Sequence, residues 1–167
     1  MKKIFRWMAA LFVAVQMMGI YSSCSDSDCS MMGRSMIYCN FYTINPDTRN
    51  VQRDTLGWLT VTALGSDSVI VNNEKNVSSV MLPLRYTSDT TALVFHYDEE
   101  NPRLCDTMII VQTNIPYFES LECGYSMRQA MNSVTHTKHQ MDSVYMRNKE
   151  ANLNGTENLK IFHPFID

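Results

Sequence analysis

The chain has 167 residues, with 14 Lys and Arg against 17 Asp and Glu, and a formal net charge of −3 at pH 7. Without the first 23 residues, 11 basic and 17 acidic residues remain and the charge becomes −6. Nucleic acids and anionic surfaces are bound by clustered Lys and Arg. The composition therefore excludes nucleic acid as the expected partner, and the length suits a single domain of common size.

The first 24 residues read as an export signal. Lys2, Lys3 and Arg6 precede a 14-residue apolar segment, residues 7–20, which is followed by Tyr21-Ser22-Ser23-Cys24. That order is typical of a secretory signal, and the apolar segment is shorter than the roughly 20 residues that span a bilayer. Two small residues before a cysteine resemble a bacterial lipobox, which implies lipidation of Cys24. The alternative is an ordinary signal, cleaved nearby, with Cys24 unmodified.

The residues after Cys24 read as a tether. Ser25-Asp26-Ser27-Asp28 is polar and acidic, and it resembles the tag that sends such lipoproteins to the outer face of the outer membrane. A plain flexible tether is the alternative. We expect a signal peptide over 1–23, a lipidated tether over 24–34 and one domain over 35–167. The expected location is the cell envelope, with acyl chains such as palmitate holding the protein to the outer membrane on its periplasmic or surface-exposed face.

Alternation of apolar and polar residues marks most of the chain after residue 34. Leu59 and Val61 flank Thr60, for example, as expected of a strand with one buried face. Pro83 lacks a backbone donor, so its strand should lie at an edge or end there. We expect strands over 35–42, 56–64, 68–71, 77–84, 91–97, 104–113, 116–123, 141–147 and 159–162, with polar turns at 47–54 and 72–76.

The stretch after Gly124 is ambiguous. Met127, Ala130, Met131 and Val134 have the spacing of an amphipathic helix, and a strand is the alternative. The prediction is one short helix here, within a mainly β chain. Short strands separated by turn residues favour an antiparallel Greek-key β-sandwich of immunoglobulin-like character.

Five cysteines remain after the signal is removed: Cys24, Cys29, Cys39, Cys105 and Cys123. If Cys24 carries lipid, the other four can pair in three ways in an oxidising compartment, and the sequence does not choose between them. We favour disulfides between Cys29 and Cys123 and between Cys39 and Cys105. Metal binding by these thiols is the alternative, but the close cysteine pair of a zinc site is missing.

Three short motifs support a family resemblance. They are Asp28-Cys29, Leu82-Pro83-Leu84 and Glu122-Cys123-Gly124, with the turn Thr87-Ser88-Asp89-Thr90 and the strand Leu93-Val94-Phe95 between the last two. With these motifs the chain resembles a family of uncharacterised Bacteroidetes-type secreted lipoproteins over about residues 24–163. The resemblance implies a compact secreted domain and brings no catalytic residues with it. Cys39 and Cys105 look like additions to the pattern.

Candidate chemistry in the sequence is sparse. His136 and His139 could share a metal ion if the segment were helical, but in a strand they would point to opposite faces. His96 and His163 read as structural or exposed. Paired carboxylates occur at Asp98-Glu99-Glu100 and at Glu119 and Glu122, with nothing that makes them face each other across a cleft. We therefore expect no catalytic residue, metal ion or cofactor.

One pattern recurs, in which Asp is followed by Ser or Thr and then by an apolar residue or Thr. It resembles the signal for O-linked glycosylation of exported proteins in the same bacterial group, although Asp ending a turn before a strand explains it equally. The candidate sites are Thr55, Ser68, Thr90, Thr107 and Ser143.

Two functions of different classes remain. The first is a non-enzymatic, membrane-tethered module that binds a glycan or an envelope protein. The second is an envelope hydrolase that uses acidic or histidine residues. A cleft with two perturbed acids would favour the hydrolase, whereas an aromatic surface would favour the binding module.

Overall fold

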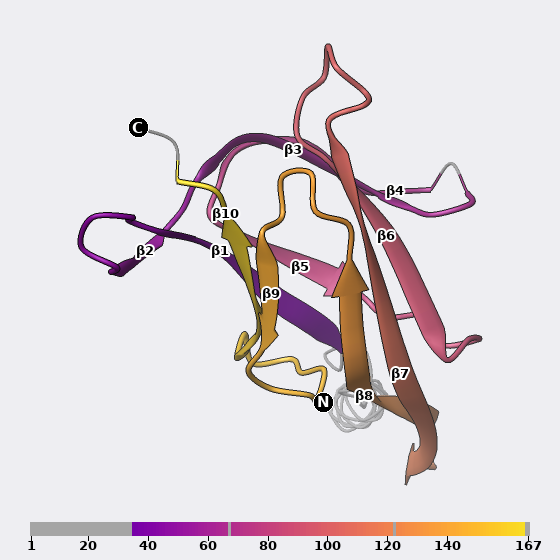
Figure 1. Ribbon diagram of the computed structural model, residues 1–167. Coiled ribbons are helices and arrows are strands. Elements are labelled where there is room, and N and C mark those ends of the chain that lie inside the picture. Colours follow the sequence, from indigo (N-terminus) through magenta and orange to yellow (C-terminus); the bar gives the residue numbers. More distant parts are fainter. Residues whose placement is uncertain (1–34, 67, 122, 166–167) are drawn as a thin grey trace, which may run out of the picture. The chain divides into compact units, whose positions relative to one another are not determined.

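The computed structural model describes residues 35–66, 68–121 and 123–165. The chain divides into two units, Met1–Ser30 and Met31–Asp167, and all described residues belong to the second unit. These residues form ten β-strands and no helix (Figure 1). The mainly β fold is therefore as predicted.

The strands make two five-stranded sheets. The first contains β2 (Val51–Arg53), β1 (Met36–Ile44), β10 (Glu157–His163) and β9 (Ser143–Met146) in that order, with β5 (Ser79–Pro83) also paired to β1. The second has the order β4 (Val69–Val77), β3 (Leu56–Ala63), β6 (Thr90–His96), β7 (Cys105–Ser120) and β8 (Gly124–His136). Neighbouring strands are antiparallel except β1 and β10, which are parallel.

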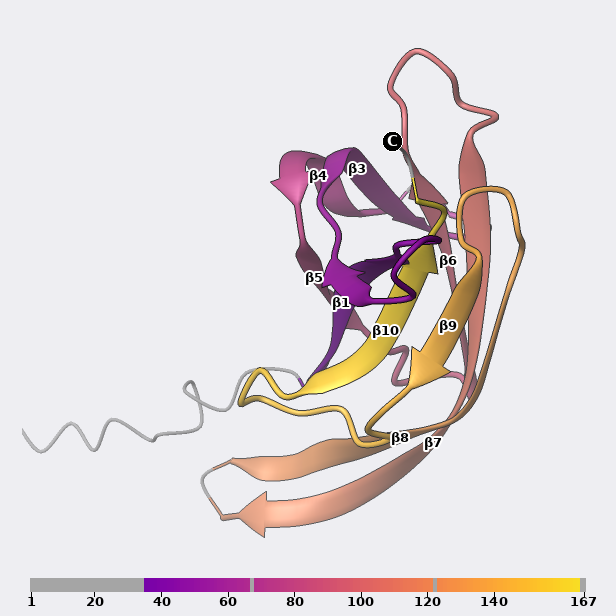
Figure 2. The ribbon, with the colours of Figure 1, turned by 60° about the vertical axis from the view of Figure 1, so that its left-hand side comes forward.

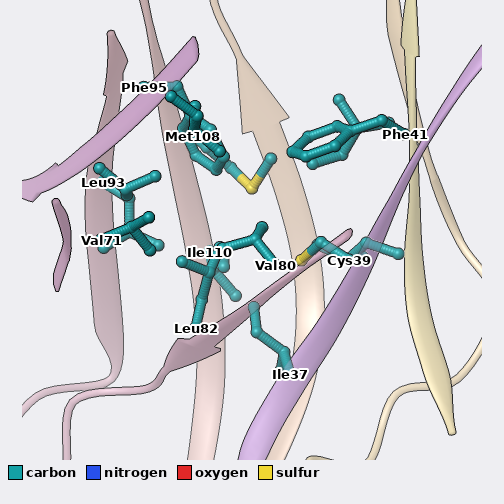
Figure 3. Close-up of a cluster of buried hydrophobic side chains, with 14 of the residues drawn as sticks. Ile37, Cys39, Phe41, Val71, Val80, Leu82, Leu93, Phe95, Met108 and Ile110 are labelled. Carbon is teal, nitrogen blue, oxygen red and sulfur yellow. The ribbon is translucent and has the colours of Figure 1, made fainter. Parts of the chain in front are cut away.

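The core lies between the two sheets, because each contributes the inward half of its alternating residues. In β1 every second residue is buried, and β6 and β7 show the same period. Figure 3 shows the side chains of β1 and β5 facing those of β6 and β7. The fully buried large side chains come from both sheets and two loops: Phe41, Phe95, Ile37, Leu59, Leu82, Leu84, Leu93, Met108, Ile110, Met131, Met141 and Leu159. This is the packing of a β-sandwich, which confirms the predicted architecture.

Two chain segments join the sheets at their edges. β4 belongs to the second sheet and β5 to the first, and the chain passes between them at Ser78, whose carbonyl accepts a hydrogen bond from the Phe41 amide at 3.1 Å. At the opposite edges, residues 149–152 bridge β8 and β1. Lys149 O accepts from Met131 N at 2.8 Å, and Asn152 exchanges two backbone hydrogen bonds with Met36, at 3.0 and 3.1 Å.

Four predictions of individual elements differ from the structure. The strands predicted over 104–113 and 116–123 are one strand, β7. The stretch after Gly124 is strand β8, not a helix, because it pairs with β7 along its length. The predicted turn at 72–76 is part of β4, and Asn73 and Asn76 adopt positive φ of 47° and 55° within it. The polar stretch 47–54 contains β2. The Greek-key, immunoglobulin-like connectivity is not confirmed.

The predicted Cys39–Cys105 disulfide is wrong. Both cysteines are free thiols in the structure. Cys39 faces inward from β1, fully buried among aliphatic side chains (Figure 3), whereas Cys105 opens β7 opposite His96 in the other sheet. Burial raises the pKa of the Cys39 thiol, and the nearby Glu157 carboxylate raises it further. The sequence predicted that both cysteines lie in strands, but it could not show that the two strands belong to different sheets.

The β7–β8 hairpin defines the two ends of the domain. β7 begins at Cys105, opposite the end of β6, and reaches Ser120 in 16 residues, roughly 50 Å along an extended strand. The end of β7 nearest Ser120 extends beyond the rest of its sheet and lies on the side of the domain where β1 starts (Figure 2). We call the end that holds Ser35 and this hairpin the tether end, and the end that holds the start of β7 and the end of β10 the distal end.

Candidate functional site

A cavity of about 340 Å³, lined by both polar and apolar side chains, opens at the distal end. It lies where β10 ends, between the β2–β3 connection and the segment that follows β6. Its lining residues are Thr43, Asp54, Thr55, Leu56, Gly57, Trp58, Tyr97, Leu104, Gln140, His163, Pro164 and Phe165. Segments that are distant in the sequence therefore contribute polar side chains to one place.

His163 stands at the centre of this arrangement. It pairs with Thr43 in the parallel β1–β10 ladder, and the Thr43 hydroxyl donates to its carbonyl oxygen at 3.2 Å. The imidazole packs on Phe41 and Tyr97, with ring centroids 5.4 and 5.5 Å away. The residue is only 7% exposed. Among the described residues, neither ring nitrogen has a hydrogen-bond partner, and Asp54 Oδ2 lies 3.8 Å from Nδ1, beyond hydrogen-bonding distance.

Tyr97 adds a second buried polar atom without a partner. Its hydroxyl is shielded from solvent and has no hydrogen-bond partner among the described residues. Burial raises the pKa of Tyr97, with smaller contributions from the Asp106 and Cys105 charges. Burial lowers the pKa of His163, and the carboxylates of Asp54 and Asp106 oppose part of that shift. Both side chains are therefore neutral at pH 7.

The donors and acceptors of the cavity suit an uncharged polar ligand. Leaving a buried polar group without a partner costs about 1–3 kcal/mol, so a ligand or an ordered water that reached Tyr97 and His163 would recover that energy. Among the described residues that line the cavity, Asp54 contributes the one carboxylate, and none is Lys or Arg. An anionic ligand would find no cation among these residues. Aromatic and apolar residues supply a surface for the non-polar face of a ligand.

A buried carboxylate shapes the loop that brings Gln140 to the cavity. Asp106 is 1% exposed, and its oxygens accept hydrogen bonds from the Thr137 hydroxyl at 2.6 Å and from the amides of His139, Gln140 and Met141 at 2.7–2.8 Å. Burial alone would raise the pKa of Asp106, but these four hydrogen bonds outweigh it and lower the pKa. The loop is therefore fixed by a charge that belongs to β7.

A larger depression of about 490 Å³ lies along β1, β4 and β5. None of its described lining residues has a buried polar side-chain atom without a partner. The depression therefore has room for a ligand but shows no unmet hydrogen-bonding group, and the distal cavity is the better candidate.

The structure places the two histidines that were considered as metal ligands in different elements. His136 lies at the end of β8, with Nδ1 2.7 Å from Thr137 O, and His139 lies in the next loop, with Nδ1 2.9 Å from Cys105 O. Within the described part of the chain, no group of three His, Cys, Asp or Glu residues could hold a metal ion. His96 lies in β6 with Nε2 3.2 Å from Thr62 Oγ1. The Asp98-Glu99-Glu100 carboxylates lie in the β6–β7 loop and Glu119 lies near the end of β7, whereas Glu122 is outside the described residues.

The other predicted site residues fall in two groups. Cys24 and Cys29 lie outside the described residues, and so lipidation and the Cys29–Cys123 pair stay predictions, although Cys123 is not a free thiol. The five glycosylation candidates lie within the described part. Thr55, Ser68, Thr90 and Ser143 are exposed and Thr107 is half-buried, so four of them are accessible to a modifying enzyme.

Sequence reasoning missed the role of His163, which was taken as structural or exposed. Its neighbours Asp54 and Tyr97 are 109 and 66 positions away in the sequence, and no local motif connects them. Only the parallel pairing of β10 with β1 brings them together.

Comparison with known proteins identifies the family. No helix in the described residues is long and apolar enough to cross a membrane. No curated protein and no solved structure matches the chain significantly. A family model, described as a family of unknown function (DUF6452), matches residues 58–163, which is more than half of the chain. The match includes β3 to β10, and with them Tyr97, Gln140 and His163 of the cavity, and so the chain belongs to this family.

Proposed function

We propose that the protein is a lipid-anchored, non-enzymatic binding module of the cell envelope, and that it binds a neutral sugar in the distal cavity. The observation that carries the proposal is a set of buried atoms at the cavity for which the described residues supply no hydrogen-bond partner: the Tyr97 hydroxyl and both nitrogens of His163. Burying three such atoms together does not stabilise a β-sandwich, because buried polar groups are normally hydrogen-bonded. A bound ligand would supply the hydrogen bonds that these atoms lack.

The position of the cavity agrees with a tethered binding role. The described chain begins at Ser35, beside the start of β1, while His163 ends β10 at the other end of the same sheet. If Cys24 carries the lipid and Cys29 pairs with Cys123 at the β7–β8 turn, the tether end faces the bilayer. The cavity then faces away from it, open to glycans of the envelope.

A sugar is the ligand class that the lining favours. Sugars present several hydroxyl groups, which can both donate to and accept from His163, Tyr97 and Gln140, and they carry no charge that would need a cation. The carboxylate of Asp54 can accept from two hydroxyls. The volume of about 340 Å³ lies near the lower limit for ligand pockets, so one or two sugar rings are expected.

Titration with neutral hexoses and N-acetylhexosamines tests the proposal. Trp58 lines the cavity and is the single tryptophan left once the predicted signal, which contains Trp7, is removed. Its emission should therefore change on binding. Tyr97→Phe and Asp54→Asn should each weaken binding about tenfold or more, since each removes a hydrogen bond from a buried site. Tyr145→Phe, on the exposed surface of β9, is the matched control and should bind as the wild type does. Binding that is unchanged in both cavity variants would contradict the proposal.

A hydrolase is the second candidate, favoured by the approach of Asp54 to His163 at 3.8 Å. The described carboxyl groups with a lowered pKa do not support it, because Asp106 and Glu157 lie on different strands, β7 and β10, and Glu157 is near the tether end. Release of a new reducing end from an oligosaccharide, abolished in Asp54→Asn, would establish the hydrolase and replace the binding role.

A further inference from the structure

The β7–β8 hairpin continues well beyond the sheet to which it belongs. β6 pairs with β7 only as far as Val111, whereas the β7–β8 pairing continues to Ser120 and Gly124. Figure 2 shows this part of the hairpin extending away from the two sheets. We call residues 115–121 and 123–128 the hairpin end.

The hairpin end exposes large apolar and aromatic side chains. Leu121 is 92% exposed, Tyr125 80% and Phe118 53%. Phe118 and Tyr125 face each other across the strands in an edge-on contact at 5.6 Å. Arg128, which pairs with Ile115, lies over the Tyr117 ring at 5.4 Å. Single exposed apolar residues are ordinary, but a cluster on a projecting element marks a contact surface.

The chain that leads to the predicted anchor starts at the root of this hairpin. Ser35, the first described residue, lines the same surface depression as Tyr117, Met127 and Arg128. Between Cys24 and Ser35 lie ten residues, which reach roughly 35 Å when fully extended. A lipid on Cys24 would therefore keep Ser35, which lies beside the hairpin end, within about 35 Å of a bilayer.

We infer that the hairpin end inserts its apolar tip into the interfacial layer of the lipid bilayer, as a second contact beside the lipid anchor. The inference rests on the anchor in the proposed function. Aromatic side chains with one polar edge, such as Tyr, accumulate in this layer. The described charges of the hairpin end, Glu119 and Arg128, have opposite signs, so apolar contact rather than attraction to anionic lipid drives the insertion. Two points of contact fix the orientation of the domain and hold the distal cavity away from the membrane.

Quenching by brominated lipid tests the insertion. The acylated protein is reconstituted into phosphatidylcholine vesicles whose acyl chains carry bromine, which quenches nearby tryptophan. Leu121→Trp adds an emission that should be largely lost in brominated vesicles and retained in unbrominated ones. Val51→Trp is the matched control, an exposed apolar residue on β2 toward the distal end. Its emission and that of Trp58 should persist. High salt should leave the result unchanged.

Three outcomes would overturn the inference. Emission that persists in Leu121→Trp excludes insertion, and if light scattering then finds a dimer that Leu121→Glu dissolves, a second copy of the chain covers the hairpin instead. Equal quenching of the Leu121→Trp and Val51→Trp probes means that the domain lies flat. Failure of the anchor itself is detected separately, as vesicles that float without wild-type protein and an N-terminal peptide without acyl mass. The sugar titration reports on the cavity independently of all three.

Discussion

The Thr137 hydroxyl donates to Asp106 Oδ1 at 2.6 Å across 31 residues of sequence. Asp106 also accepts from the three consecutive amides of His139, Gln140 and Met141. One buried carboxylate thus binds the amides of residues 139–141, between Thr137 and Asp142, whose own amides donate to Thr107 and Phe162. It holds in place both Met141, which is buried in the core, and Gln140, which lines the cavity.

Asp106→Asn should destabilise the protein by about 3 kcal/mol, because hydrogen bonds to a buried charge contribute more than neutral ones and an amide group cannot accept from four donors. Urea unfolding measures the change in the free energy of unfolding. Asp142→Asn in the same loop is the matched control, since Asp142 is exposed, and it should change stability little. Equal stability of Asp106→Asn and wild type would mean that the loop does not depend on this charge.

Acid should remove the same stabilisation. The pKa of Asp106 is lowered in the folded protein. Below the pKa of an Asp side chain in the unfolded chain, about 3.9, the unfolded chain therefore binds a proton at Asp106 while the folded protein remains ionised there. The stabilisation is complete above that pH and is lost as the pH falls toward the folded pKa. A series of urea curves from pH 6 to pH 2 should therefore fall more steeply for the wild type than for Asp106→Asn.

His163→Phe should raise the stability of the protein while abolishing sugar binding. Phenylalanine keeps the ring contacts with Phe41 and Tyr97 and removes two buried nitrogens without partners, which is worth about 1–2 kcal/mol. Urea unfolding measures the gain and the sugar titration measures the loss. A His96→Phe variant is the control for the change of residue type, since His96 is only half-buried and lies outside the cavity lining. A less stable His163→Phe variant would show that the nitrogens have partners in solution.

The same histidine predicts a second pH dependence. Burial lowers the pKa of His163, so below the unfolded value of about 6.5 the unfolded chain binds a proton first. Stability is therefore full above about pH 6.5 and declines below it, toward the folded pKa. The wild type should unfold at lower urea concentration at pH 5 than at pH 7.5. His163→Phe should lose this difference, and a wild type without it would contradict the burial of a neutral imidazole.

The cysteines should differ in reactivity. Cys105 is half-buried and should react with a thiol reagent in the native protein, whereas Cys39, fully buried and with a raised pKa, should react only after unfolding. Peptide mapping without reduction should find Cys29 linked to Cys123. Recovery of a Cys39–Cys105 peptide would revive the pairing that the structure contradicts, and unlinked Cys29 would remove the second tie of the tether.

Cys24→Ala should release the protein from membranes. The wild type should pellet with the membrane fraction and carry acyl mass on its N-terminal peptide, and the variant should be in the supernatant without that mass. Cys29→Ala is the matched control, because it removes a cysteine five residues away and leaves the lipobox-like sequence unchanged. A Cys24→Ala protein that still pellets, with an unmodified wild-type peptide, would exclude the anchor.

The sequence predicted the strands where alternation is regular and failed where a bulge breaks it. In β8 the register shifts opposite Val111 and Gln112, which pair with Ser133 and Met131 and leave Asn132 as an extra residue. The bulge lets Met131 and Val134 both face the core, three residues apart. That spacing is the helical signal in the sequence, and so a β-bulge accounts for the helix that was predicted.

The candidate site could not be predicted, for a different reason. Asp54 lies between β2 and β3, Tyr97 follows β6 and His163 ends β10, so the site exists only through tertiary pairing. Each residue alone is unremarkable in sequence. The projection of the hairpin end beyond the sheet could not be predicted either, because it depends on where β6 ends.

The parallel pairing of β1 with β10 joins strands about 120 residues apart, from Tyr38 with Glu157 to Thr43 with His163. Contacts of such long range form late and slow the folding of a chain. A chain that is synthesised or exported from its N-terminus therefore cannot complete its first sheet until β10 has been delivered. The edge of β1 that pairs with β10 stays without its strand partner until then. An unpaired strand edge can template pairing with another chain, so this interval is when the protein is most exposed to aggregation.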